Sequence, residues 1–342
     1  MPRIRVPQSF SAGLFLTYCC PSACRHCLYA CSPAWPADWP GLEELEACLA
    51  ALSRRLRPHP WGPRTVGFNY GLHFTGGEPF LNFELLLDGV RLASEYRLPS
   101  LFVETNCFWC RDDDLTRDRL LALKGAGLHG LLVSVNPFTV ERIPFERLER
   151  AIRLGQQVFG RNLLIYQVEF YHLFRQQGLQ GTLPLEDFLT LFGPRAFAGT
   201  TELLLAGRAA YRLQHLFPVH PAERFLAQPC PTPLLRNWHN HVDNYGNLLP
   251  GFCGGLSLGH WRDLDRLETE GLELQEYPIL KYLISGDMAG LLDLARAHGY
   301  RTRPAGYISK CHLCLDLRKC LADQGDFREL RPREFYKHLE ND

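Results

Sequence analysis

Residues 13–31, GLFLTYCCPSACRHCLYAC, decide how this chain can be organised. Within this stretch Cys20, Cys24 and Cys27 stand at spacings of three and two residues. Because Pro21 follows the first of these cysteines, the segment predicts a loop directly after an apolar strand. Such a loop can wrap around three corners of a cuboidal [4Fe-4S] cluster, which leaves the fourth iron without a protein ligand.

An iron without a protein ligand can bind a small molecule through an amine and a carboxylate, while the cluster supplies one electron. The cysteine spacing and its place after the strand resemble the radical S-adenosylmethionine (SAM) superfamily. The resemblance implies that SAM binds the free iron and is reductively cleaved to methionine and a 5′-deoxyadenosyl radical. His26 stands where the family often has Tyr or Phe, and it can still stack against adenine.

Other interpretations of short cysteine spacings are a structural zinc site, disulfides in a secreted protein, and buried thiols without a ligand. The 13 cysteines of the chain fall into clusters apart from Cys48, whereas disulfide scaffolds are short and spread their cysteines more evenly. The start, MPRIRVPQSF, lacks the apolar core of a signal peptide. We therefore expect a reducing, cytoplasmic compartment.

The composition is that of a globular protein: 342 residues, 46% hydrophobic and 22% charged. The 37 Lys and Arg residues balance 37 Asp and Glu residues, which gives no support for a nucleic-acid or membrane surface. No apolar run reaches the roughly 18 residues that a membrane span needs. The length suits one large domain or two medium domains.

Apolar runs alternate with helical patterns along the first two thirds of the chain. This alternation predicts six parallel strands joined by right-handed helical crossovers, an α/β fold. Six strands are too few for an eight-stranded barrel, so we expect a partial (β/α)6 TIM-like barrel in residues 1–216. The expected strands are residues 13–19, 66–74, 101–104, 131–136, 163–170 and 202–206, and the expected helices are residues 42–56, 82–95, 115–126, 144–158 and 185–192.

Polar clusters follow several of these strands, at the strand ends where such folds bind ligands. The run Gly76-Gly77-Glu78-Pro79 allows the backbone to approach a ligand closely and adds a carboxylate. It resembles the GGEP motif of radical SAM enzymes, which implies that Gly76, Gly77 and Glu78 receive the SAM amino group. A plain strand-to-helix turn is the alternative.

The resemblance extends to further strand ends. Thr105 and Asn106 match the family's Thr-Asn segment, although Cys107 replaces the glycine that commonly follows. Ser134 and Asn136 fit a Ser-x-Asp pattern around the ribose and the SAM carboxylate, with Asn136 lacking the charge. The resemblance also implies that Arg208 contacts the SAM carboxylate and that Glu169 contacts adenine. Each of these residues could instead be a helix cap or a surface polar group.

Cys107 and Cys110, in TNCFWC, could contribute to a metal site or a redox pair. No second CxxC pair lies nearby in the sequence. We therefore predict that they are buried or substrate-adjacent thiols without a metal.

Beyond Phe217 the strand and helix alternation stops and a second set of cysteines appears, which predicts a smaller C-terminal domain at residues 217–342. A hairpin turn is expected at Asp243–Asn247. The pattern resembles the SPASM/Twitch extension of radical SAM enzymes, which implies auxiliary [4Fe-4S] ligands. A full SPASM pattern has a further cysteine where Gln324 stands, so one auxiliary cluster is expected, with structural zinc as the alternative. The five candidate ligands, one more than a cluster needs, are Cys230, Cys253, Cys311, Cys314 and Cys320.

His239 and His241 precede the expected turn and would point to one face of a strand. A histidine pair of this kind is more often a hydrogen-bonded part of the fold than a ligand. Contact with the substrate is the alternative.

The leading functional hypothesis is a radical SAM enzyme that abstracts hydrogen from a peptide or protein side chain, as SPASM-type maturases do. A radical SAM dehydrogenase or epimerase of a small molecule is the rival enzyme, and an iron-sulfur or zinc scaffold is the rival without catalysis. We expect an electron donor such as flavodoxin or ferredoxin, and neither a nucleic acid nor a membrane as partner.

Overall fold

The structure is a computed structural model that describes residues 3–193, 196, 203–230 and 233–340. The chain divides into two compact units. Residues 10–24 and 31–203 form the sheet unit, and residues 1–9, 25–30 and 204–342 form the cysteine-rich unit. Cys20 and Cys24 thus belong to the sheet unit, and Cys27 belongs to the cysteine-rich unit.

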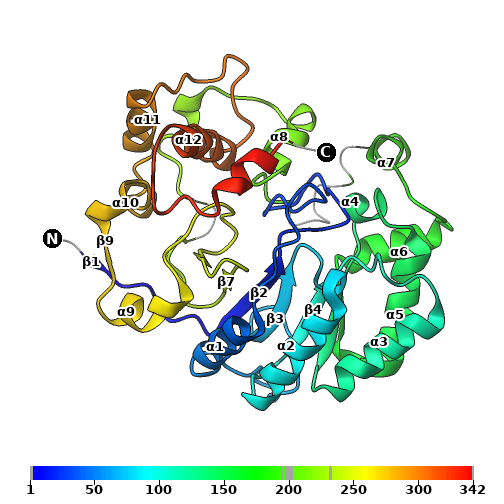
Figure 1. The fold of residues 1–342 in the computed structure, drawn as a ribbon. Coiled ribbons are helices and arrows are strands. Elements are labelled where there is room, and N and C mark those ends of the chain that lie inside the picture. Colours follow the sequence, from blue (N-terminus) through cyan, green and yellow to red (C-terminus); the bar gives the residue numbers. More distant parts are fainter. Residues whose placement is uncertain (1–2, 194–195, 197–202, 231–232, 341–342) are drawn as a thin grey trace. The chain divides into compact units, whose positions relative to one another are not determined.

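The sheet unit alternates strands and helices, as the sequence predicts (Figure 1). Its elements are β2 (Ser11–Thr17), α1 (Leu42–Ser53), β3 (Gly71–Gly76), α2 (Phe83–Glu95), β4 (Phe102–Thr105), α3 (Asp113–Gly125), β5 (Gly130–Ser134), α4 (Pro137–Val140), α5 (Phe145–Phe159), β6 (Leu163–Tyr166), α6 (Val168–Gln176) and α7 (Leu185–Phe192).

Strands β2 to β6 lie side by side in chain order, and every neighbouring pair is parallel. Parallel neighbours require crossover connections, which helices α1, α2, α3 and α5 provide. The side-chain oxygens of Asn82 and Asp112 accept backbone N–H bonds at the starts of α2 and α3. The predicted α/β class with an incomplete barrel of parallel strands is confirmed.

The two faces of this sheet bury different residues, because successive side chains of a strand point to opposite faces. Phe74 points outward, since a Cβ atom on Gly89 of α2 would lie 3.3 Å from its ring. Phe102 and Leu132 point to the opposite side, which we call the inner face, and pack there with Val66, Leu164 and Tyr166. Fully burying a side chain such as Phe102 contributes about 1.5–3 kcal/mol.

Three strand predictions need correction. The second strand begins at Gly71 rather than at residue 66. The fifth strand ends at Tyr166 rather than residue 170, because Gln167 takes a left-handed conformation (φ +67°) and α6 begins at the next residue. Helix α6 buries Phe170 and Phe174, one turn apart, so the apolar run LLIYQVEF is divided between a strand and a helix.

The sixth expected strand, residues 202–206, does not form over its described part, residues 203–206, and Glu202 lies outside the described residues. The carbonyl of Leu205 accepts a hydrogen bond from the hydroxyl of Ser309 at 2.8 Å. A side chain thus satisfies a backbone group that a strand ladder would otherwise use.

The cysteine-rich unit consists of short elements. Its hairpin is formed by β7 and β8, which pair antiparallel with His241 opposite Leu249, and this confirms the predicted turn. The elements are β1 (Arg3–Ile4), α8 (Ala209–Arg212), β7 (Asn240–Val242), β8 (Leu248–Leu249), α9 (Leu264–Thr269), β9 (Leu272–Glu273), α10 (Pro278–Ser285), α11 (Met288–Ala297) and α12 (Lys310–Gln324). Strands β1 and β9 pair antiparallel.

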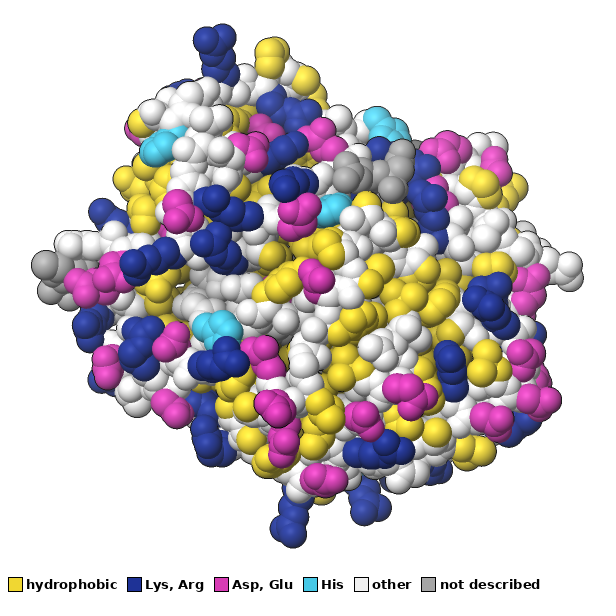
Figure 2. Space-filling model, viewed as in Figure 1, with side chains coloured by type: hydrophobic (Ala, Val, Ile, Leu, Met, Phe, Trp, Pro, Cys, Tyr) yellow, Lys and Arg dark blue, Asp and Glu magenta, His cyan; other side chains and the backbone are white. Residues whose placement is uncertain are grey.

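Charged side chains of both signs are interspersed on the face that Figure 2 shows. This distribution agrees with the balanced composition of the sequence. Within the described part of the chain, no helix combines the length and the apolar character needed to cross a membrane.

Candidate active site

The Gly-Gly-Glu turn after β3 pairs with the chain at the start of the cysteine loop. The backbone N–H of Gly77 donates to the carbonyl of Thr17 at 2.7 Å, and that of Glu78 donates to the carbonyl of Cys19 at 3.1 Å. A Cβ atom on Gly77 would lie 1.9 Å from the carbonyl oxygen of Cys19. The turn therefore needs glycine at this position, because the two backbones approach closely.

We expect Gly77→Ala to destabilise the sheet unit by at least about 2 kcal/mol, since backbone atoms cannot yield to the added methyl group. The change should lower the thermal midpoint of the apoprotein and reduce iron incorporation. Gly125→Ala is the matched control, because nothing lies within 4 Å of a Cβ atom at this last residue of α3. Equal thermal midpoints for the two variants would contradict the predicted close approach.

Glu78 is fully buried at the centre of this turn. Its carboxylate accepts hydrogen bonds from the Thr105 hydroxyl at 2.9 Å, the Asn106 backbone N–H at 2.9 Å and the Phe80 backbone N–H at 3.2 Å. Burial raises the pKa of Glu78 to about 7, although these donors act to lower it. Three hydrogen bonds thus hold the Glu78 carboxylate in place. A positively charged ligand group beside it would lower its pKa and keep it ionised.

The Thr-Asn segment after β4 connects Glu78 with the cysteine loop. Its backbone contacts Glu78, and the side-chain amide of Asn106 donates to the sulfur of Cys20 at 3.5 Å. The structure therefore brings the predicted site residues Gly77, Glu78, Thr105 and Asn106 together with Cys20. They meet at the carboxyl ends of β3 and β4, where parallel sheets bind ligands.

Trp109 is a member of this cluster that the sequence analysis did not identify. Its indole N–H donates to the Thr105 hydroxyl at 3.0 Å, and its ring stacks on Phe80 with centroids 4.0 Å apart. The only sequence signal for this role of Trp109 was its position four residues after Thr105. Trp109 thereby holds the hydroxyl that contacts Glu78.

Cys107 and Cys110 are both fully buried, as predicted. Burial raises the pKa of Cys107 well above its usual range, and the neighbouring Cys110 thiol raises it further. Cys107 is therefore a neutral thiol at ordinary pH.

Ser134 is the last residue of β5 and Asn136 follows the strand, and the two side chains face different surroundings. Ser134 is half-buried and lies on the inner face, two residues beyond Leu132. The side-chain oxygen of Asn136 accepts hydrogen bonds from the backbone N–H groups of Phe138 and Thr139 at 3.1 and 3.0 Å. Asn136 thus caps helix α4, which is the alternative that its residue type allowed.

Glu169 is exposed in the first turn of α6 rather than placed on a strand. The adenine contact implied by the family resemblance had assumed that strand. The prediction lacks its structural basis, because the fifth strand ends three residues earlier.

Arg208 is fully buried in the cysteine-rich unit and holds the end of the cysteine loop. Its guanidinium donates to the carbonyls of Ala30 at 2.7 Å and His338 at 3.4 Å, and its backbone N–H donates to the carbonyl of Cys27 at 2.9 Å. These bonds give Arg208 a positioning role beside Cys27. Contact with the SAM carboxylate stays a prediction.

Four of the five C-terminal cysteines influence one another electrostatically. Burial raises the pKa of Cys253 to about 11, and Cys314 and Cys230 raise it further. Burial likewise raises the pKa of Cys311 to about 12, with Cys253, Cys314 and Cys230 adding to the effect. The fold thus gathers four thiols from three separate segments, a donor set that fits one [4Fe-4S] cluster.

Cys320 is the cysteine outside this group. It lies six residues after Cys314 on α12, about 120° around the helix. The Cys320 thiol contacts the carbonyl of His298 at 3.9 Å. Burial raises the pKa of this thiol, and the carboxylates of Asp323 and Asp316 raise it further. The spacing of the last cysteine run could not separate it from the other four candidates, whereas its direction on the helix does.

Arg318 places a buried positive charge among the four thiols. Its guanidinium donates to the carbonyl of Gly254 at 3.0 Å and to the Tyr336 hydroxyl at 3.2 Å. This charge acts to lower the pKa values of Cys253 and Cys314. It would favour the thiolate forms that bind metal.

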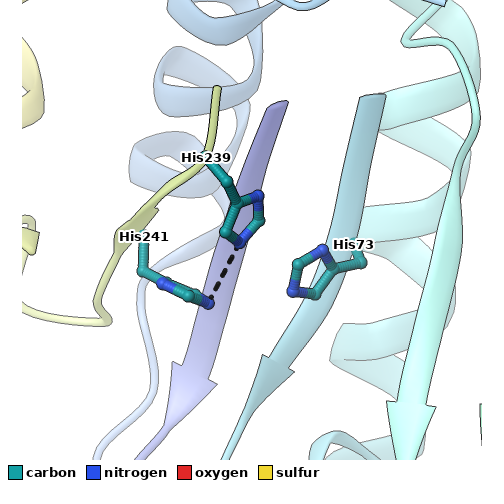
Figure 3. A group of neighbouring side chains, drawn as sticks. All are labelled: His73, His239 and His241. Carbon is teal, nitrogen blue, oxygen red and sulfur yellow. Dashed lines mark hydrogen bonds between the residues drawn. The ribbon is translucent and has the colours of Figure 1, made fainter. Parts of the chain in front are cut away.

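His239 and His241 contact one another, as Figure 3 shows, with their Nε2 atoms 3.4 Å apart. The Nδ1 atom of His241 also lies 3.0 Å from the Tyr29 hydroxyl. Both histidines are buried. The pair is hydrogen-bonded within the fold, which is the more ordinary of its two predicted roles.

No protein-family model and no curated protein matches the chain. Among solved structures, the chain is similar to native anSMEcpe with bound AdoMet and Cp18Cys peptide, at 12% identity over 98% of this chain and 100% of that chain, with a TM-score of 0.43. It is similar to BtrN in complex with AdoMet and 2-DOIA, at 16% identity over 84% of this chain and 89% of that chain, with a TM-score of 0.41. It is also similar to Streptococcus suis SuiB bound to S-adenosylmethionine, at 12% identity over 71% of this chain and 60% of SuiB, with a TM-score of 0.40. At TM-scores this low the likeness says nothing about the chemistry of this chain, which is inferred below from its own residues.

Proposed function

We propose that this chain is a radical SAM enzyme. The observation that carries the proposal is the Thr-Asn segment at the end of β4, which hydrogen-bonds both the Glu78 carboxylate and the sulfur of Cys20. These two groups would hold the amino group of SAM and the cluster, respectively. One short segment would therefore fix the proposed SAM anchor, Glu78, relative to a proposed cluster ligand, Cys20.

Three cysteines would hold the SAM-binding cluster, namely Cys20, Cys24 and Cys27. When bound, this cluster would supply the electron that cleaves SAM to methionine and a 5′-deoxyadenosyl radical. Glu78, in its ionised form, would accept hydrogen bonds from the SAM amino group. Ser134 on the inner face would contact the ribose.

A second [4Fe-4S] cluster would be held by Cys230, Cys253, Cys311 and Cys314. Arg318 would partly neutralise the charge of these thiolates. We propose residues 1–216 as the part that performs SAM chemistry and residues 217–342 as the auxiliary part. A small electron-transfer protein such as flavodoxin or ferredoxin is the proposed reductant.

The proposed substrate is a peptide or protein side chain with an unreactive C–H bond. The support is the resemblance of the C-terminal cysteines to the SPASM/Twitch extension, whose members include enzymes that modify peptides and proteins as well as dehydrogenases of small molecules. The chain's task is to position this bond and to exclude water and stray reductants from the radical.

The test is the formation of 5′-deoxyadenosine. Anaerobically reconstituted protein, reduced with dithionite and mixed with SAM, should produce 5′-deoxyadenosine and methionine, and unreduced protein should produce neither. Both products are measured by liquid chromatography, with the cluster verified by iron content and electron paramagnetic resonance. Failure to form 5′-deoxyadenosine with the cluster present would leave only the scaffold interpretation.

A further inference from the structure

The inner face of the sheet carries a group of three polar side chains, His73, Thr75 and Glu104, directly below the proposed SAM site. Thr75 on β3 and Glu104 on β4 occupy the same level, because the register pairs His73 with Phe102 two residues earlier. Glu104 in turn pairs with Leu132 on β5. Ser134 lies two residues further along β5, about 7 Å toward the carboxyl ends of the strands.

The Glu104 carboxylate is held from two sides. The Thr75 hydroxyl donates to its Oε2 atom at 2.7 Å, and the Nε2 atom of His73 lies 3.4 Å from its Oε1 atom. His73 is almost fully buried, and burial lowers its pKa to about 3. The imidazole is therefore neutral near pH 7 and does not neutralise the carboxylate.

Glu104 is the only carboxylate of this polar group, and His73 is the only basic side chain at ion-pair distance from it among the described residues. Lysine and arginine, which usually compensate a recessed carboxylate, do not contact it there. Desolvation by the surrounding protein raises the pKa of Glu104 to about 7. Even so, 32% of the Glu104 side chain is exposed to solvent. An enclosed but accessible carboxylate without a compensating cation is suited to receive one from a ligand.

We propose that Glu104 binds the ammonium group of the substrate. The proposal rests on the proposed function, because it places the substrate on the inner face one level below Ser134, which is proposed to contact the SAM ribose. An ammonium group brings a positive charge and three hydrogen-bond donors. A hydroxyl group would bring one donor and would leave the carboxylate charge uncompensated.

The experiment compares two ligands of the same size that differ in charge. Reconstituted protein with SAM is titrated calorimetrically with n-butylammonium and with n-butanol at pH 8, where Glu104 is ionised. The unmodified protein should bind n-butylammonium about tenfold more tightly, because charge-assisted hydrogen bonds are roughly twice as strong as neutral ones. Glu104→Gln should abolish this preference, and Glu104→Asp should retain part of it.

Glu104→Gln keeps an oxygen for the Thr75 hydroxyl, so folding is checked by its thermal midpoint. Glu95→Gln, an exposed carboxylate at the end of α2, is the matched control and should keep the full preference. Equal binding of the two ligands by the unmodified protein would overturn the proposal, as would a preference that survives in Glu104→Gln. Tighter binding of n-butanol would instead identify a hydroxyl site and overturn the ammonium assignment.

Two sources of the ammonium group are separated by a parallel titration. An acetylated and amidated Ala-Lys-Ala peptide that binds more tightly than n-butylammonium would assign the group to a peptide lysine, and weaker binding would assign it to a small molecule. These titrations require no SAM cleavage. A preference for n-butylammonium without 5′-deoxyadenosine formation would thus refute the enzyme proposal alone, and the converse result would refute the Glu104 assignment alone.

Discussion

Replacing Cys20, Cys24 and Cys27 together with alanine is expected to reduce 5′-deoxyadenosine formation below detection. The physical reason is that SAM cleavage requires an electron, and these three thiolates are the proposed ligands of the cluster that delivers it. The iron content should fall from about 8 to about 4 atoms per chain, because the auxiliary cluster has its own ligands. Iron analysis and product chromatography on the same sample measure both effects.

Cys19→Ser is the matched control for this triple variant. Cys19 is adjacent to Cys20 and half-buried, and it lies outside the three-and-two spacing. The control should keep its iron and its 5′-deoxyadenosine formation. Loss of activity in Cys19→Ser with retention in the triple variant would show that the spacing identified the wrong thiols.

The double substitution of Cys311 and Cys314 by serine is expected to remove the auxiliary cluster and to preserve the SAM-binding one. Two substitutions are needed because three thiolates can still hold a cubane, as proposed for the cysteine loop. Iron content should again fall from about 8 to about 4 atoms per chain, now with 5′-deoxyadenosine formation retained. Electron paramagnetic resonance of the reduced protein should lose the signal of one of two clusters.

Cys320→Ser on the same helix is the control for the double variant. The Cys320 thiol lies on another side of α12 from Cys314 and is not among the four proposed cluster ligands, so both clusters should remain. If Cys320→Ser removed a cluster, the assignment of the four ligands would be wrong. Protein prepared with both iron and zinc is also examined by elemental analysis. Zinc bound by these four cysteines would refute the auxiliary cluster itself.

Much of the sheet unit could be predicted from the sequence. Local patterns sufficed for β2 to β5 because buried parallel strands are apolar and the helices between them carry one apolar face. The pattern failed at residues 163–170, where a short apolar run suits either a strand or a buried helix. It also failed at residues 203–206. There the hydroxyl of Ser309, about a hundred residues away in the chain, donates a hydrogen bond to the carbonyl of Leu205.

The sequence by itself predicted the chemistry of the candidate sites, because thiolate spacing, adjacent glycines and the carboxylate that follows them are properties of short segments. Only the tertiary structure decided which distant segments meet. It separated Cys320 from four other thiols through its direction on a helix, used Asn136 as a cap, and placed Glu104 on the inner face beneath Ser134. These outcomes depend on register and packing between elements, and no single segment of the sequence carries that information.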